Sequence, residues 1–180
     1  MARTSSLSSD AWLAARVSVE VVEGDCNETM DRVVAAIPEW GLNVALVDPY
    51  NLAGLRFETI ARLAKFKRMD LIVFFPIGEI RRNLERNRAT YSVYLDRALG
   101  TDEWQRIVKS KRDVTKLIGV FQRQLERRFG YTAGQVRAVP IRNEKNVTLY
   151  HLVFASRHSR GDVIWESITR RTPGGQRGLF

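Results

Sequence analysis

The stretch Met-Asp-Leu-Ile-Val-Phe-Phe-Pro, residues 69–76, decides the fold. It is rich in aliphatic and aromatic side chains, and it predicts a strand covered on both faces, as parallel strands between helices are. Upstream, Asn43–Val47 predicts another strand, and the apolar spacing of Phe57–Ala64 predicts a helix between the two. This strand–helix–strand order favours an α/β fold with a largely parallel sheet.

The pattern extends towards the N-terminus. The short β-branched run Val17–Val22 predicts an earlier strand. Apolar residues at helical spacing over Met30–Ile37 predict a helix that Pro38 ends.

The chain becomes helical after Pro76. An apolar face from Ile80 to Leu95 predicts one helix that stops at Gly100, and a second helical stretch is predicted from Thr101 to Gly130.

Two strands, Val136–Ile141 and Val147–Ala155, then form a predicted hairpin. Pro140 lacks an amide proton, which places its strand at the sheet edge, whereas Val147–Ala155 is apolar on both faces and belongs inside. Ile164, Trp165 and Ile168 predict a closing helix.

These elements predict a single domain over residues 17–171, with a helical insertion at 76–130 and flexible ends at 1–16 and 172–180. The longest apolar run, Leu71–Ile77, is shorter than the ~18 residues that a membrane helix needs. Cys26 is the only cysteine, and no signal-peptide core precedes it. We therefore expect a cytoplasmic protein without membrane contact.

Charge is distributed unevenly along the chain. Residues 1–60 carry 4 Lys/Arg against 9 Asp/Glu, residues 61–135 carry 17 against 8, and residues 136–180 carry 8 against 3. A basic surface of this extent attracts polyanions, of which nucleic acid is the commonest. The candidate phosphate contacts are Arg81, Arg82, Arg86, Arg88, Lys109, Lys111 and Arg112. Because they form no single helical stripe, an ordinary solvated surface is the alternative.

Two predicted strands end in acids, at Asp25 and at Asp48. Since ligands of open α/β sheets bind beyond the carboxyl ends of strands, both acids are expected at the same rim. Each could instead cap the following helix. Around Asp48, however, Pro49 fixes the turn and leaves carbonyl acceptors free, and Tyr50 offers a face for stacking on a planar base.

Several common sites are absent from the sequence. No Gly-x-Gly-x-x-Gly and no Gly-x-x-x-x-Gly-Lys occurs, and His151, His158 and Cys26 do not have a zinc-binding spacing. No metal is expected, and Cys26 is interpreted as a small residue at a strand–helix turn.

The turn Asp48-Pro49-Tyr50 partly resembles the Asp/Asn-Pro-Pro-Tyr loop of amino-methyltransferases. More widely, the segments 24–27, 47–51, 57–64, 69–76, 80–83, 99–104 and 151–156 resemble the three-Cys-motif partner protein family. The resemblance extends from Val17 to about Ile168 and implies a Rossmann-like class I methyltransferase-type sheet.

That resemblance implies S-adenosylmethionine as cofactor, with Asp25 and Asn27 near its adenine and Asp48, Pro49 and Tyr50 beside the transferred methyl group. It also implies a neighbouring three-cysteine-motif protein as a partner. Strands 17–22, 43–48 and 69–75 would be the third, fourth and fifth of that sheet.

The first two strands and the glycine loop have no counterpart in this sequence. The chain is therefore expected to be a fragment, to have its missing half supplied by another polypeptide, or to fold as a reduced sheet whose exposed edge could pair in an oligomer. Three functions follow: methylation of a nucleic acid, nucleic-acid binding without catalysis, and interaction with the partner protein.

Overall fold

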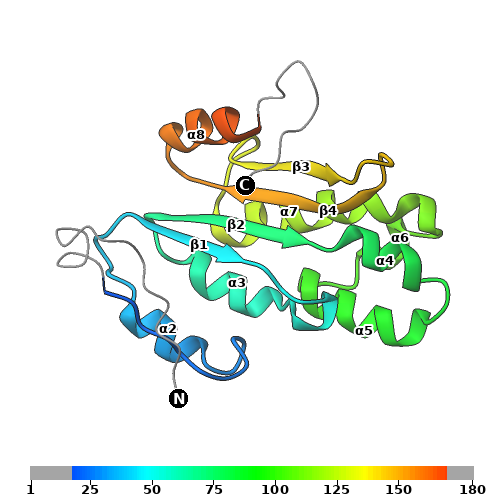
Figure 1. Cartoon of the computed structure of the whole chain (residues 1–180), viewed down its shortest axis with the longest axis horizontal. Helices are drawn as coiled ribbons and strands as arrows, with labels where there is room; N and C mark the ends of the chain where they lie inside the picture. The colour runs from blue at the N-terminus through cyan, green and yellow to red at the C-terminus, as the bar shows by residue number, and fades with distance from the viewer. Residues whose placement is uncertain (1–17, 170–180) are drawn as a thin grey trace.

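The computed structural model describes residues 18–169, which form an α/β structure around one mixed sheet (Figure 1). The strands are β1 (Asn43–Val47), β2 (Met69–Phe75), β3 (Val136–Arg142) and β4 (Thr148–Ala155), in the spatial order β1-β2-β4-β3. β1 and β2 are parallel, whereas β4 runs antiparallel to both of its neighbours. The expected α/β class, hairpin, edge position of Pro140 and interior position of β4 are confirmed. The expectation of a largely parallel sheet is wrong, because the hairpin returns β4 between β2 and β3.

One face of the sheet carries the main core. It is covered by α3 (Phe57–Ala64) and α7 (Leu117–Phe129), and α5 (Arg88–Leu99) packs against both of these helices. Leu71, Val73 and Phe75 of β2 are buried against these helices, while the alternate residues of β2 are only half-buried. This alternation follows from the two-residue period of a strand.

The helical region is more divided than the sequence predicts. The single helix expected over 80–99 is two helices, α4 (Ile77–Asn83) and α5, joined by a turn. The stretch expected over 101–129 consists of α6 (Trp104–Ile107), the 3₁₀ helix η2 (Lys111–Lys116) and α7. A capping box between Ser110 and Asp113 begins η2, so local hydrogen bonds compete with one continuous helix. Gly100 and Gly130 end α5 and α7 in the left-handed region, at φ of 65° and 68°.

The opposite face is covered only in part by the described residues. α8 (Ser159–Thr169) lies alone on that side in Figure 1, and its Trp165 ring stacks on Phe154 with 5.1 Å between centroids. Further along this face, Val44 and Leu46 of β1 are 67% and 65% exposed. The sheet therefore presents apolar side chains to solvent beside its β1 edge.

The N-terminal part contains α2 (Met30–Ala36), which ends before Pro38 as predicted, and the short 3₁₀ helix η1 (Leu52–Gly54) follows β1. The strand predicted at 17–22 is wrong for the described residues 18–22, which pair with no strand and leave Val19 and Val21 78% and 75% exposed. Alternating β-branched residues favour extended backbone, but a strand also needs a neighbour. The predicted ends, 1–16 and 172–180, lie outside the described residues. Within residues 18–169, no helix combines the length and the apolar character required to cross a bilayer.

Candidate functional site

The carboxyl end of β1 leads directly into the loop that carries Asp48 and Pro49. This loop is fixed from the neighbouring element, because the Leu52 amide donates to Glu79 Oε2 over 3.0 Å. The Tyr91 hydroxyl donates to the other oxygen, Glu79 Oε1, over 2.9 Å. Within the loop, the Asn51 side chain accepts from the Gly54 amide at 3.1 Å. Glu79, at the start of α4, therefore holds the loop after β1 against α5.

The turn that holds Asp25 and Asn27 lies against the same loop. Asn27 donates to Asp25 Oδ1 from its backbone at 2.8 Å and from its side chain at 2.9 Å. The Asn27 side-chain amide also donates to the Gly54 carbonyl at 3.1 Å, and its oxygen accepts from Thr59 Oγ1 at 2.6 Å. The two acidic turns, far apart in sequence, thus meet at one end of the sheet.

Those contacts determine the electrostatics of Asp25. The backbone and then the side-chain hydrogen bonds from Asn27 hold the pKa of the exposed Asp25 carboxyl below its usual range, with Arg56, 3.9 Å away, acting in the same direction. Asp25 therefore remains ionised at neutral pH. Both donors of the Asn27 amide group are already used within the fold, so Asn27 acts first as the tie between the two turns.

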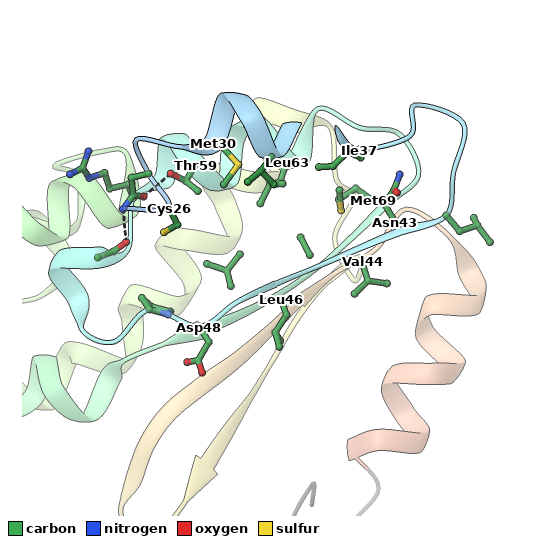
Figure 2. A pocket seen from close by; sticks show the side chains of 18 residues that line it. Cys26, Met30, Ile37, Asn43, Val44, Leu46, Asp48, Thr59, Leu63 and Met69 are labelled. Atoms are coloured by element: carbon green, nitrogen blue, oxygen red, sulfur yellow. Dashed lines mark hydrogen bonds between the residues drawn. The ribbon is translucent and has the colours of Figure 1, made fainter. Parts of the chain in front are cut away.

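A groove of about 570 Å³ runs between α2 and β1 (Figure 2). One end is polar and contains Asn27, Asp48, Pro49, Arg56 and Thr59. The rest of the lining on the α2 side is mostly apolar, with Met30, Val33, Ile37, Leu42 and Met69 beside Asn43. This volume is within the range of small-molecule sites. Figure 2 shows Cys26, Met30 and Leu63 on the α2 side of β1, whereas Val44, Leu46 and Asp48 point to the other side of the strand.

Tyr50 lies outside this groove. Its side chain is fully exposed, at 101% of the reference accessibility, and it does not line the cavity. The sequence predicted it as a stacking wall beside the reacting groups. In the structure, its ring is available only to a partner that approaches from solvent.

The predicted phosphate contacts come from two segments that the fold brings together. Arg81 and Arg82 lie on α4, Arg86 lies in the turn before α5, and Arg88 begins α5; Lys109 lies just before η2, and Lys111 and Arg112 lie on it. Glu85 joins the segments, since Oε1 accepts from the Lys111 amide at 3.1 Å and Oε2 lies 3.8 Å from Lys111 Nζ. Arg88 is already engaged, with its guanidinium 3.4 Å from the Val108 carbonyl and 5.9 Å from the Trp104 ring centroid. We call the group formed by all these residues the basic region.

Sequence reasoning missed three residues near these sites: Glu79, Arg56 and His151. Glu79 carried a weak signal, because it follows β2 within one helical turn. His151 lies on β4 near Arg81 and Arg142, and its Nδ1 is buried without a hydrogen-bond partner in the described residues. Burial, followed by the two arginines, lowers the pKa of His151.

Comparison of the chain with protein-family models, curated proteins and solved structures finds no match. Among residues 18–169, no group of three or more His, Cys, Asp and Glu side chains is arranged to hold a metal ion.

Proposed function

We propose that this protein takes part in S-adenosylmethionine-dependent methylation of a nucleic acid, through a Rossmann-like, methyltransferase-type sheet. The observation that carries the proposal is the position of Asp48 and Pro49 at the carboxyl end of β1, in one groove with Asn27 and Cys26. Ligands of open α/β sheets bind at this end of the strands. The order β1-β2-β4-β3 with an antiparallel β4 also supports the family resemblance drawn from the sequence.

The residues present suit such a cofactor in size and polarity. The groove offers an apolar surface under α2 for a flat ring, and Asn27, Arg56 and Thr59 at its polar end supply polar groups for hydroxyl or amino groups of the ligand. When bound, S-adenosylmethionine would supply an electrophilic methyl group. Asp25, which stays ionised beside this end, would orient donor groups of the ligand.

Asp48 and the carbonyl next to Pro49 would accept hydrogen bonds from an exocyclic amine of the base. Such bonds orient the amine lone pair towards the methyl group, which lowers the barrier through positioning and electrostatics. The rigid turn at Pro49 and the brace from Glu79 would keep these acceptors in place. The exposed Tyr50 ring would stack on the incoming base from the solvent side.

Calorimetry and methyl transfer test this proposal on the full chain. We expect the wild-type protein to bind S-adenosylmethionine or S-adenosylhomocysteine. Asp48→Asn should retain that binding and reduce labelled-methyl transfer to single-stranded DNA or RNA by about 10²–10³-fold. Asp102→Asn, a change at an exposed acid elsewhere, is the matched control. If neither ligand gives a binding heat, S-adenosylmethionine is not a cofactor of this protein.

A second candidate function is nucleic-acid binding without catalysis, working with a three-cysteine-motif partner protein. It is favoured by the basic region, where two separate segments place exposed Arg82, Arg86, Lys109, Lys111 and Arg112 on neighbouring elements. Salt-dependent binding without methyl transfer would favour this function, and co-purification with the partner protein would test the association.

A further inference from the structure

Helix α2 lies beside β1 at a place where the described sheet has no strand. Its Met30 and Val33 side chains line the groove, together with Ile37 just after the helix and Leu63 of α3. In Figure 2 this apolar surface lies along the open side of β1. One further strand beside β1 could pack its side chains against this apolar surface of α2.

The backbone of β1 has amide groups that are free to pair with a strand on that side. The Asn43 amide donates to the Arg68 carbonyl at 2.9 Å, so Asn43 faces β2. Because successive residues of a parallel strand point their amides in alternate directions, the amides of Val44 and Leu46 face away from β2. Among residues 18–169, no strand pairs with this edge.

The side chains at the same edge are apolar on both faces of the sheet. Val44 and Leu46 are largely exposed on one face, and Ile72 and Phe74 of β2 lie on that face within the second core cluster. The α2 surface lies on the other face. A strand added beside β1 would therefore bury apolar side chains on both sides, as an interior strand does.

The charge of the segment that carries α2 indicates the chemistry of the added strand. Residues 18–42, which carry α2, contain six acidic side chains and one basic side chain. Only Asp25 and Asp31 of these acids have ion-pair partners in the described residues, Arg56 and Arg62 respectively. Glu20, Glu23 and Glu28 are exposed, whereas Glu39 shares a second hollow with Lys65, Lys67 and Arg68. We call this excess of exposed acids in residues 18–42 the acidic rim. It favours a partner strand that is flanked by basic residues.

We propose that the β1 edge and the α2 groove bind a β-strand of a partner polypeptide, apolar on both faces and flanked by Lys or Arg. Main-chain hydrogen bonds to Val44 and Leu46 would provide affinity, and the α2 surface and acidic rim would provide specificity. A second copy of this chain fits less well, because two-fold pairing at β1 would bring two acidic 18–42 segments together. This interaction does not rest on the proposed methylation, but the strand would occupy the apolar part of the same groove, so it would compete there with the proposed cofactor.

Hydrogen exchange on the full-length chain tests the proposal without any substitution. The probe is the peptide Lys-Lys-Val-Ala-Val-Ala-Val-Lys-Lys, and the matched control replaces each Lys with Glu. We expect fast exchange at the Val44 and Leu46 amides of the free protein and at least tenfold slower exchange with saturating Lys peptide. The Ala45 and Val47 amides, which face β2, should change little.

Three results would overturn the proposal. Protection of Val44 and Leu46 in the free protein at all concentrations would mean that the chain itself covers the edge. Protection that increases with protein concentration would identify a second copy as the occupant. Equal affinity for the Lys and Glu peptides would exclude the proposed charge complementarity.

A pair of variants then assigns the contact to the backbone. Leu46→Pro removes an outward-facing amide and should weaken binding of the Lys peptide about tenfold. Leu46→Val keeps the amide and an apolar side chain, and should bind within about twofold of wild type. Circular dichroism checks that both variants remain folded. Equal binding by the two variants would contradict strand pairing at β1.

Discussion

Arg157 is the residue that ties the ends of two helices to the sheet. Its guanidinium donates to the carbonyls of Ala64 at 3.0 Å and Phe129 at 2.8 Å, which lie at the ends of α3 and α7. It also lies 4.0 Å from the Tyr131 ring centroid. Carbonyls at helix ends lack partners within the helix, so a cation there stabilises both ends.

We therefore predict that Arg157→Ala lowers the free energy of unfolding by roughly 2–4 kcal/mol, measured by urea denaturation. Arg157→Lys should recover only part of this loss, because a single ammonium nitrogen cannot also replace Nη1, which donates to the Phe66 carbonyl and the Tyr131 hydroxyl. The control is Arg160→Ala at an exposed position, expected to change stability by less than about 0.5 kcal/mol. If Arg157→Ala changes the free energy of unfolding as little as Arg160→Ala does, Arg157 does not stabilise the two helix ends.

His151 makes stability depend on pH. Burial and the nearby Arg81 and Arg142 lower the pKa of His151 below its ordinary 6.5, so the folded state binds this proton less tightly than the unfolded state does. Stability is therefore full above pH 6.5 and decreases as the pH falls through that value. The thermal midpoint of wild type should fall more between pH 8 and pH 5 than that of His151→Asn. An identical fall in both proteins would assign the pH dependence to other groups.

At the scale of elements, the approach of α4 to β4 requires a residue without a side chain. A Cβ atom at Gly78 would lie 2.6 Å from the Leu149 carbonyl oxygen, which is part of the β4 backbone. Because α4 also supplies Glu79 to the loop after β1, this packing helps to position the candidate site.

Gly78→Ala should accordingly destabilise the protein by roughly 1–3 kcal/mol, because backbone must move to admit the methyl group. Gly119→Ala in α7 is the matched control. Its Cβ would meet only the flexible end of Arg123, at 3.4 Å, and removing a helix-interior glycine should stabilise by about 0.5–1 kcal/mol. Chemical denaturation measures the change in the free energy of unfolding for each variant. A change of the same sign in both variants would contradict the close approach of α4 to β4.

At the scale of the whole molecule, the basic region lies after the carboxyl end of β2, whereas Lys67 lies before its start. If phosphates bind the basic region, replacing Arg82, Arg86 and Arg112 with Glu should weaken binding to single-stranded DNA. The slope of log K against log salt should also fall by roughly 2. Lys67→Glu, at the opposite end, should leave the slope unchanged. Fluorescence anisotropy at several salt concentrations measures it, and an unchanged slope in the triple variant would indicate a solvated surface.

The sequence by itself determined the elements whose signal is local. A continuous apolar run predicted β2, apolar periodicity predicted α3 and the helical stretch that contains α7, glycines predicted the ends of α5 and α7, and Pro140 predicted the edge strand. It also indicated that Asp25 and Asp48 belong to one rim, because both follow extended segments that lead into turns. These features depend on a few neighbouring residues, so a single sequence contains them.

Only the tertiary structure decided which extended segments become strands and which side chains share a site. Residues 18–22 have the composition of a strand but no neighbouring strand among the described residues, and Tyr50 points to solvent although it follows Asp48 by only two positions. Glu79, Arg157 and the junction between η2 and the α4–α5 turn connect residues far apart in sequence. Such contacts depend on the packing of whole elements, and no local pattern of residue types encodes that packing.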